Sequence, residues 1–292
     1  MKITNLYQIF LTLILCIFIF APIFYLDGPK ILYNFESVYY FSPQEKEPEV
    51  NSGVKVIWEK KEVLGVYKPP DLPMHEGGLY RFNTFEHLVK QKIHPECSSV
   101  HRLDKETSGV VLCSSSSEVR GLLAKSLRER SVTKTYDAIV FGKALKSNWT
   151  ATQPIGQITT PHQRVKQAVC ENGLPSETHF EVLRTTDNFS WLRCYPKTGR
   201  THQIRVHAAF YGHHLVGDNR YNPDDSLFSE FLLKGFTKKV AKKCLTKRLC
   251  LHAKSISFVH PITKEITDIN IGEDNEMLQI WNQLTEGKTY AL

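Results

Sequence analysis

One short stretch of the sequence carries the residue types of a catalytic site. HRLDKETSG (101–109) places the carboxylate of Asp104 between two cations, Arg102 and Lys105. A nearby cation lowers the pKa of a carboxyl group and keeps it charged. An ionised carboxylate is able to act as a nucleophile or as a general base. The alternative is a surface ion pair, which is the usual role of an aspartate with basic neighbours.

A second stretch supplies cations that could hold this carboxylate. PKTGRTHQIRVH (196–207) has a turn followed by a sequence of helical character, with Arg200 before the expected helix and Arg205 on it. If the helix packs beside the first stretch, Arg205 is placed to form an ion pair with Asp104. Otherwise Arg205 is a solvated cation on the helix surface.

Histidines and cysteines give no sign of a metal or disulfide framework. His202 and His207 are five residues apart, whereas two ligands on one helix face need a spacing of three or four. We therefore interpret both as hydrogen-bonding structural residues. The cysteine number is odd, no C-x-x-C pair is present, and we expect reduced, mostly buried thiols at positions 16, 97, 113, 170, 194, 244 and 250.

The elements that must position these residues follow from local patterns. TKTYDAIVFGK (133–143) alternates as a strand does, with Tyr136, Ala138 and Val140 on one face. By spacing alone, Tyr136 is a core residue. Further strands are expected in 54–70, 110–115, 177–195 and 254–271, and helices in 85–93, 116–130, 201–212 and 275–284. This mixture predicts an α+β fold with a mixed or mostly antiparallel central sheet flanked by helices.

The N-terminus differs from the rest of the chain. Residues 3–26 carry no charge and include LTLILCIFIF, a run long enough for a membrane span. We expect a hydrophobic helix over 1–26, a linker over 27–53 and one catalytic domain over 54–292. The apolar run is interpreted as an anchor with the body facing the cytoplasm or an organelle matrix, as a targeting segment, or as an artefact of the assigned start.

The charge is concentrated in the body of the chain. The formal net charge is +7, and residues 1–53 contribute −2, so residues 54–292 carry +7 + 2 = +9. A basic body suits a polyanionic partner, although charge alone also serves solubility. The segment 234–248 holds seven cations and no acid. It is either a solvated basic helix face or a surface that contacts phosphates.

Several of these stretches together resemble the pseudouridine synthases, and specifically the RluA-type branch that modifies uridines in tRNA and rRNA. The likeness covers about residues 54–270. It is carried by VYKPPDLPMH (66–75), HRLDKETSGVVL (101–112), TKTYDAIVFGK (133–143), TGRTHQIRVHAAFYGHHLVGDNRY (198–221) and LCLHAKSISFVHP (249–261).

The resemblance implies a pseudouridine synthase fold and an isomerisation of uridine to pseudouridine. Asp104 matches the catalytic aspartate of the family, which either attacks the ribose or removes a ribose proton. Tyr136 matches the tyrosine that packs against the target base and helps to remove the C5 proton. Arg205 matches the arginine that pairs with the aspartate. Arg102 matches a position that helps to hold the RNA with its target base flipped out.

Other residues are assigned to substrate binding. Leu251 is expected to pack near the base, and the basic segment is expected to contact phosphates. The assigned set is His101, Lys68, Arg200, Leu251, Lys238, Lys239, Lys242 and Lys243. No small N-terminal RNA-binding domain is expected, because 27–53 is too short for one.

The expected partner is tRNA or rRNA, bound by an intracellular monomer that needs no cofactor or metal, with membrane association through residues 3–26 as a further expectation. Two alternatives remain at this point. A catalytically inactive RNA-binding protein of the same fold would be expected to lose Asp104, Tyr136 or Arg205, and all three are present. A glycosyl hydrolase would need a second acid opposite Asp104, and Glu106 lies too near in sequence to be assigned that role.

Overall fold

The computed structural model describes residues 30–34, 37–41 and 47–286. The chain divides after Lys46 into two compact units, and the first contains an antiparallel hairpin of β1 (Lys30–Asn34) and β2 (Ser37–Phe41). These strands lie in the segment that we interpreted as a linker. The hydrophobic helix expected over 1–26 lies outside the described residues. None of the helices that the structure describes combines the length and the apolar character needed to cross a bilayer.

The second unit begins at Glu47, before the expected domain start at residue 54. The carboxylate of Glu47 accepts hydrogen bonds from the backbone N–H groups of Arg81, Phe82 and Asn83, at 2.6, 2.7 and 2.8 Å. The end of the predicted linker is therefore attached to the body of the protein.

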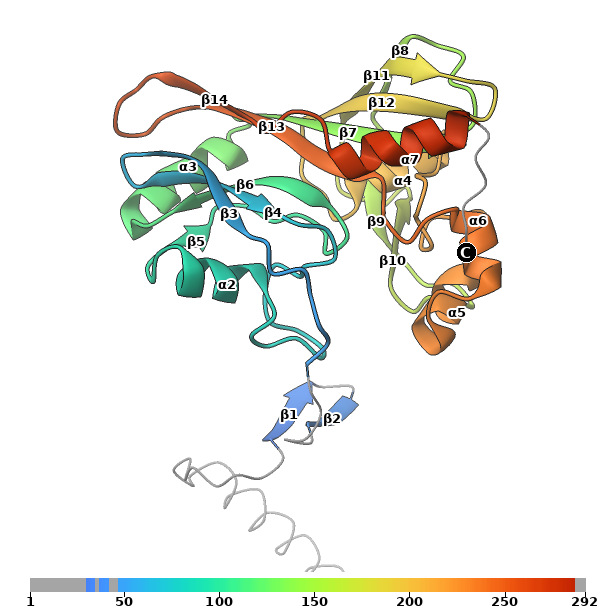
Figure 1. The fold of residues 1–292 in the computed structure, drawn as a ribbon, viewed down its shortest axis with the longest axis horizontal. Coiled ribbons are helices and arrows are strands. Elements are labelled where there is room, and N and C mark those ends of the chain that lie inside the picture. Colours follow the sequence, from blue (N-terminus) through green and yellow to red (C-terminus); the bar gives the residue numbers. More distant parts are fainter. Residues whose placement is uncertain (1–29, 35–36, 42–46, 287–292) are drawn as a thin grey trace, which may run out of the picture. The chain divides into compact units, whose positions relative to one another are not determined.

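One mixed sheet organises this unit (Figure 1). Its main path runs through β3 (Lys55–Lys60), β4 (Val63–Lys68), β6 (Ser108–Ser114), β13 (Leu251–Val259), β7 (Thr133–Phe141), β12 (Phe189–Pro196), β11 (Thr178–Thr185) and β8 (Asn148–Ala151). Off this path, β5 (Ser98–Ser99) pairs with β6 and β14 (Ile266–Asn270) pairs with β13. Within the described residues, β6 and β13 are the single parallel pair of this sheet, so the expected mixed, mostly antiparallel sheet is confirmed.

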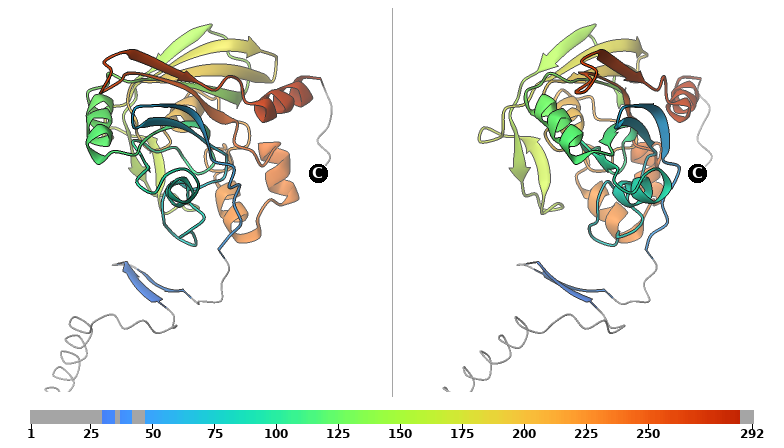
Figure 2. Two further views of the ribbon diagram at one scale, coloured as in Figure 1. Left: turned by 60° about the vertical axis from the view of Figure 1, so that its left-hand side comes forward. Right: turned by 90° about the vertical axis from the view of Figure 1, so that its left-hand side faces the viewer.

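Helices flank the sheet, and a small hairpin of β9 (Ile155–Ile158) and β10 (Lys166–Val169) stands apart from it. The described helices are α2 (Phe85–Lys92), α3 (Ser117–Arg128), α4 (Gln203–Phe210), α5 (Ser226–Lys234), α6 (Lys238–Cys244) and α7 (Asn275–Thr285). Two further views place α2, α5 and α6 on the same side of the sheet (Figure 2). The sequence patterns indicated α2, α3, α4 and α7, but α5 and the strands β5, β8, β9 and β10 were missed.

The strand that follows the HRLDKETSG stretch is buried on both faces. Every residue of β6 is buried. Val111 packs in one cluster with residues of α2, while Val110 and Leu112 pack in another with residues of α3. Burial on two faces explains why this strand is a continuous apolar run rather than an alternating one. The end of the HRLDKETSG loop is thus joined to a rigid centre.

The strand that carries Tyr136 is covered in the same way. Ala138 and Val140 of β7 share a cluster with Ile204 of α4, and Ile139 packs with Trp281 of α7. This is the alternation expected from the sequence, and it sets α4 against the Tyr136 face of the strand. The six cysteines among the described residues are free, and five of them are buried, as expected.

Candidate active site

Asp104 lies in the loop between β5 and β6, and Lys68 holds this loop through hydrogen bonds to its backbone. The ammonium group of Lys68 donates hydrogen bonds to the backbone oxygens of Pro69, Lys105 and Thr107, at 3.0, 2.8 and 2.7 Å. The Lys68 side chain is fully buried, and burial lowers its pKa to about 7. The two hydrogen bonds to the carbonyls of Lys105 and Thr107 tie the loop and hold Asp104 in one position.

A glycine allows this loop to enter the sheet. Gly109 has φ +126°, in the region that favours glycine, and a Cβ there would lie 2.2 Å from the carbonyl oxygen of Ala253. The close approach lets β6 run parallel beside β13, with Gly109 paired to Ala253. Only glycine suits this position, at the end of the HRLDKETSG loop.

Arg205 brings α4 to the loop. Its side chain is buried, and its Nη1 lies 3.5 Å from a carboxylate oxygen of Asp104 and 3.5 Å from one of Glu106. Its strongest partner is Asp218, which accepts hydrogen bonds from Nε and Nη2 at 2.7 and 2.9 Å. The expected ion pair with Asp104 is therefore present, but the two short bonds of the guanidinium go elsewhere.

Asp218 is held as firmly as the arginine. It also accepts the backbone N–H groups of Arg220 and Tyr221, at 3.0 and 3.1 Å. Although burial opposes it, the pKa of Asp218 is lowered because Arg205 and these N–H groups stabilise the charged form. Fixed by Asp218, Arg205 presents its remaining nitrogen toward Asp104.

The electrostatics of Asp104 differ from the expectation. Burial raises its pKa above the ordinary value, and this effect outweighs the opposing attraction of Arg205 and Arg102. Lys105 is turned away, since its ammonium donates to the Tyr80 hydroxyl at 2.7 Å. The prediction that flanking cations give a lowered pKa is therefore wrong, because desolvation is the larger effect. The Asp104 side chain remains 17% exposed and is accessible to a ligand.

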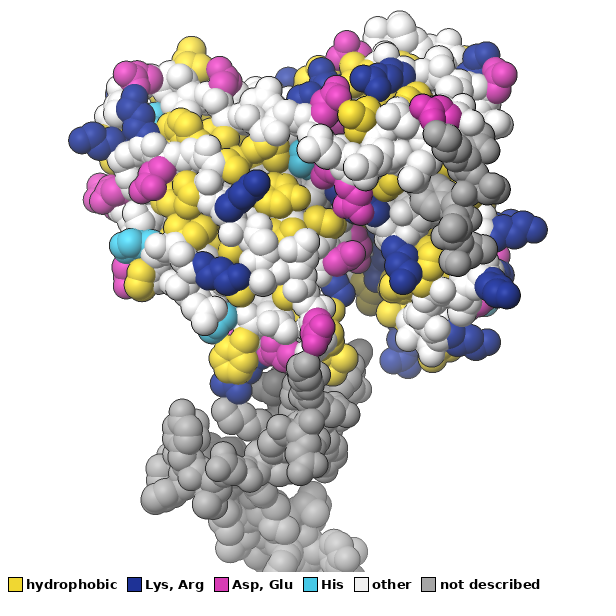
Figure 3. Space-filling model, in the orientation of Figure 1, with side chains coloured by type: hydrophobic (Ala, Val, Ile, Leu, Met, Phe, Trp, Pro, Cys, Tyr) yellow, Lys and Arg dark blue, Asp and Glu magenta, His cyan; other side chains and the backbone are white. Residues whose placement is uncertain are grey.

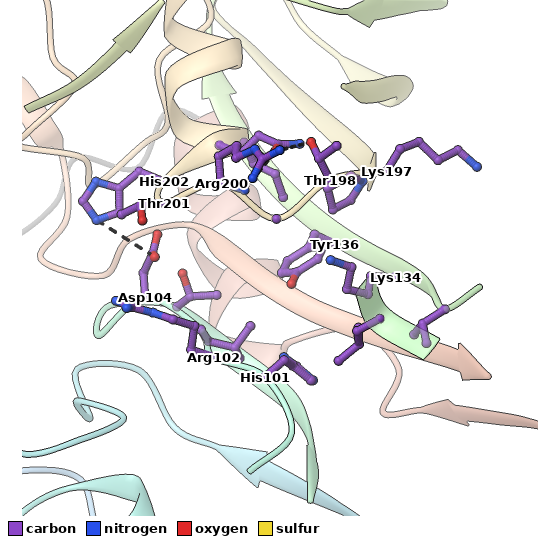
Figure 4. Close-up of a pocket in the computed structure, with 18 of the residues that line it drawn as sticks. His101, Arg102, Asp104, Lys134, Tyr136, Lys197, Thr198, Arg200, Thr201 and His202 are labelled. Carbon is purple, nitrogen blue, oxygen red and sulfur yellow. Dashed lines mark hydrogen bonds and ion pairs between the residues drawn. The ribbon is translucent and has the colours of Figure 1, made fainter. Parts of the chain in front are cut away.

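Tyr136 and Leu251 complete the wall of the pocket on the sheet side. Both line the same pocket as Asp104. Figure 4 shows the Tyr136 ring facing the pocket across from Asp104. Burial, followed by the nearby charge of Asp104, raises the pKa of the Tyr136 phenol far above its usual range. The hydroxyl therefore stays protonated at neutral pH.

The pocket has a volume of about 560 Å³ and a strongly cationic rim. Among the described residues that line it, Asp104 is the only acid. The lining cations are Arg102, Arg128, Arg130, Lys134, Lys197 and Arg200. Such a surface suits a ligand that carries several negative charges around one reacting centre.

Two histidines at the pocket are neutral hydrogen-bonding residues. Burial lowers the pKa of His101 to about 4 and that of His202 to about 3. His101 Nε2 accepts the backbone N–H of Leu112 at 3.1 Å, and His202 Nδ1 lies 2.8 Å from the Tyr221 hydroxyl. His202 Nε2 also lies 4.0 Å from Asp104. Both rings therefore shape the site without adding charge.

Most of the predicted site residues meet at this pocket. Arg102, His101, Arg200 and Leu251 line it together with Asp104 and Tyr136, and Arg205 stands directly behind Asp104. Lys68 does not line it, because its ammonium is occupied by backbone carbonyls. In the described part of the chain, no group of three or more His, Cys, Asp or Glu residues is arranged to hold a metal ion.

The predicted lysines of the basic segment lie elsewhere. Lys238, Lys239, Lys242 and Lys243 belong to α6 and do not line the pocket. Figure 3 shows several Lys and Arg side chains over α5 and α6. Lys239 is paired with Asp224 and Glu230 of the same region, at 3.5 and 3.4 Å. Its charge is therefore partly neutralised.

Sequence reasoning missed Asp218 and several of the pocket cations. Lys134 had a usable signal, because it lies two residues before Tyr136 on β7 and thus on the same face. Asp218 had none, since nothing local indicates which acid meets Arg205. Arg128 ends α3, Arg130 lies in the turn that follows, and Lys197 comes directly after β12.

Three comparisons with known proteins point to one family. A family model described as RNA pseudouridylate synthase matches residues 62–210. The ribosomal large subunit pseudouridine synthase C of Salmonella typhimurium is 34% identical over 237 residues, which cover 80% of this chain and 70% of that protein. Synthase D of Haemophilus influenzae is 30% identical over 245 residues, covering 80% and 72%. The structure of human RNA pseudouridylate synthase domain containing 1 matches with a TM-score of 0.62 and 26% identity, over 78% of this chain and 86% of that one.

Proposed function

Because this chain belongs to the RNA pseudouridylate synthase family, in its RluA-type branch, we propose that it isomerises a uridine of large-subunit ribosomal RNA with Asp104 as the catalytic carboxylate. As an RNA pseudouridine synthase, the protein is an isomerase. The ribosomal substrate is suggested by the names of the similar proteins from Salmonella and Haemophilus. Transfer RNA is the alternative substrate.

The observation that carries the assignment of Asp104 is its setting. It is a partly exposed carboxylate in a pocket whose other charged lining residues are cations, and Arg205 Nη1 lies 3.5 Å from it. The cations suit phosphates on either side of a target nucleotide. The carboxylate is then the group that faces the sugar.

The reaction breaks the N1–C1′ bond, turns the uracil and forms a C5–C1′ bond. The target base must first leave its stack, which costs a few kcal/mol, and phosphate contacts from Arg102 and Arg200 would help to offset that cost. Asp104 either attacks the ribose or removes a ribose proton, and its negative charge stabilises positive character at C1′. Overall, a proton leaves C5 and N1 gains one, so no external group is consumed.

Tyr136 is assigned to base packing. Its phenol keeps its proton at neutral pH, because burial raises the pKa. A protonated phenol does not accept the C5 proton, so the raised pKa favours stacking of the ring against the base over proton removal. Leu251, which is buried in the same wall, supports the base from the sheet side.

The geometry is unfavourable to the hydrolytic alternative. Glu106 and Asp104 both approach the same Nη1 atom of Arg205, and Glu106 does not line the pocket. A hydrolase needs its two carboxyl groups on opposite sides of the scissile bond. The inactive alternative is separated from the enzyme by the experiment that follows.

The proposal is tested by mapping pseudouridine in ribosomal and transfer RNA from cells that express the wild type, Asp104→Asn or the control Asp187→Asn. Asp187 is an exposed residue paired with Lys143, remote from the pocket. We expect a site in large-subunit RNA to be modified by the wild type and the control but not by Asp104→Asn. Retained modification in Asp104→Asn would refute the role of Asp104, and a tRNA site would refute the ribosomal assignment.

The proposed substrate also bears on location. A ribosomal RNA substrate requires the body of the protein to face a compartment that holds ribosomes or their precursors. We therefore propose an intracellular body. The monomeric state and the membrane association through residues 3–26, which lie outside the described residues, stay predictions from the sequence.

A further inference from the structure

A second pocket adjoins the active site and has no part in the mechanism above. Its volume is about 400 Å³, which lies within the range of small-ligand sites. It shares Arg130, Val132, Lys134, Pro196 and Lys197 with the first pocket. Its other lining residues are Thr133, His179, Glu181 and Tyr195. A ligand that fills the first pocket is therefore able to continue directly into the second.

The register of the sheet explains how the two pockets meet. Tyr136 of β7 is paired with Cys194 of β12. Since successive side chains of a strand alternate between faces, Tyr195 lies on the face opposite to Tyr136. The pockets thus occupy two faces and join around the end of β12. Figure 4 shows Lys134 and Lys197 on the side of the first pocket away from Asp104, toward this junction.

The second pocket offers an aromatic surface. His179 and Tyr195 are directly paired across β11 and β12, and their ring centroids are 6.0 Å apart with a tilt of 34°. The Tyr195 hydroxyl donates to Glu181 at 2.9 Å, which fixes the ring. Both aromatic residues remain partly exposed. Partly exposed rings beside a cationic groove are the usual means of holding unpaired bases.

The charges around the second pocket favour one orientation of a bound nucleotide. Arg130 and Lys197 are exposed, and neither forms an ion pair with another described residue. Glu181 lies with the aromatic pair and repels a phosphate from that end. A bound nucleotide therefore fits with its phosphate toward Arg130 and Lys197 and its base toward His179 and Tyr195.

We propose that this second pocket binds an unpaired nucleotide that flanks the target uridine in the same RNA strand, with its base against His179 and Tyr195. The inference rests on the proposed function, because it takes the first pocket as the site of the target uridine. It adds a contact that would select RNA segments with a second unstacked base near the modified position.

The test uses short oligouridines that carry one 2-aminopurine at successive positions, because stacking on an aromatic ring quenches its fluorescence. The same samples are assayed for pseudouridine. The variants are Tyr195→Ala, Tyr195→Phe, which keeps the ring and removes the bond to Glu181, and the control Phe210→Ala. Phe210 is an exposed aromatic residue that lines neither pocket. Circular dichroism and thermal unfolding establish that each variant is folded.

We expect one probe position to be quenched in the wild type, in Tyr195→Phe and in Phe210→Ala, and not in Tyr195→Ala. The Kd of Tyr195→Ala should rise by about 5- to 100-fold, as expected for a lost base–aromatic stack. Its KM should rise while kcat changes little. Equal quenching and equal Kd in Tyr195→Ala would overturn the inference.

The two proposals fail in different ways. If the wild type forms no pseudouridine in any RNA, the proposed function is wrong. A comparison of 2-aminopurine quenching between Tyr195→Ala and the wild type still decides whether the second pocket holds a base. If pseudouridine forms but quenching is independent of Tyr195, only the second pocket has been misassigned.

Lys197→Gln should weaken RNA binding and reduce the salt dependence of binding if the phosphate lies where we infer.

Discussion

Arg205 binds Asp218 through two hydrogen bonds of 2.7 and 2.9 Å and offers Asp104 only its third nitrogen, at 3.5 Å. A bidentate pair fixes the plane of a guanidinium group as well as its position. The orientation of the cation behind the proposed catalytic carboxylate is thus set by a residue that is not in contact with the pocket. Arg205 and Asp218 are both buried, so each charge relies on the other to offset its loss of hydration.

Asp218→Asn tests this dependence. Loss of Asp218 leaves Arg205 only its longer contacts with Asp104 and Glu106, and removing one partner of a buried pair costs about 3–5 kcal/mol of stability. A displaced Arg205 should also lower kcat by about a hundredfold, since misplacement by about 1 Å has effects of that size. Urea unfolding and single-turnover kinetics measure the two effects. Asp225→Asn, which breaks the pair with Lys166 and lies outside the pocket lining, should lower stability with a much smaller effect on kcat. A similar loss of kcat in both variants would contradict the positioning role.

Asp104→Asn should be at least as stable as the wild type at neutral pH. Burial raises the pKa of Asp104 in the folded protein. At any pH between the ordinary pKa and this raised pKa, Asp104 is mostly protonated in the folded protein and mostly ionised in the unfolded chain. The stability that this proton contributes is present at low pH and is lost as the pH rises through the folded-state pKa. An amide avoids this loss. Urea unfolding should show that the free energy of unfolding of Asp104→Asn exceeds that of the wild type at neutral pH, and that the difference shrinks toward acid pH. A free energy of unfolding clearly below that of the wild type at neutral pH would speak against the raised pKa.

Lys68→Met distinguishes a structural lysine from an RNA-binding one. Its ammonium is used by three backbone carbonyls, and a buried acceptor left without a donor costs about 1–3 kcal/mol. We expect a stability loss of about 3 kcal/mol or more, with an unchanged RNA affinity for the protein that remains folded. Chemical unfolding and RNA titration measure both, with Lys90→Met as an exposed lysine control. A higher Kd for RNA in Lys68→Met, with the stability of the wild type, would instead support the RNA contact predicted from the sequence.

The basic segment is tested through its salt dependence. Changing Lys238, Lys242 and Lys243 together to Gln removes three exposed cations of α6. Each lost phosphate contact should lower the slope of log K against log salt by about 0.7 for a single strand. Lys239 is left unchanged because it is engaged by acids of the same region.

The matched control replaces the exposed residues Lys143, Lys146 and Lys264 with Gln, which lowers the net charge equally. Equal slopes in the two triple variants would show that α6 acts through overall charge alone. A smaller slope only in the α6 variant would support direct phosphate contacts.

Several elements of the site were predictable because they are encoded locally. The alternation of β7 placed Tyr136 with Ala138 and Val140, and the structure packs all three in one cluster. The apolar run of β6 and the amphipathic pattern of α3 follow from the same short-range periodicities. Burial of the cysteines also followed from their type. Such signals need only a few neighbouring residues.

The predictions that differ from the structure depended on distant residues. Whether Lys68 faces RNA or the interior is decided by carbonyls of a loop 37 and 39 residues further along the chain. The pKa of Asp104 depends on how much of the chain closes over it, so the charges beside it in sequence gave the wrong direction. The segment 27–53 was judged by composition, and the hairpin of β1 and β2 was overlooked.

By itself, the sequence determined the family, the order of most strands and helices around the site, and the types of residue proposed to do the chemistry. Only the tertiary structure decided that Asp218 orients Arg205, that Lys68 ties the Asp104 loop, and that a second pocket opens beside the first. The physical reason is that periodicity is a property of adjacent residues. The depth of burial and the choice of partner for a charged side chain are set by every segment that the fold brings around it.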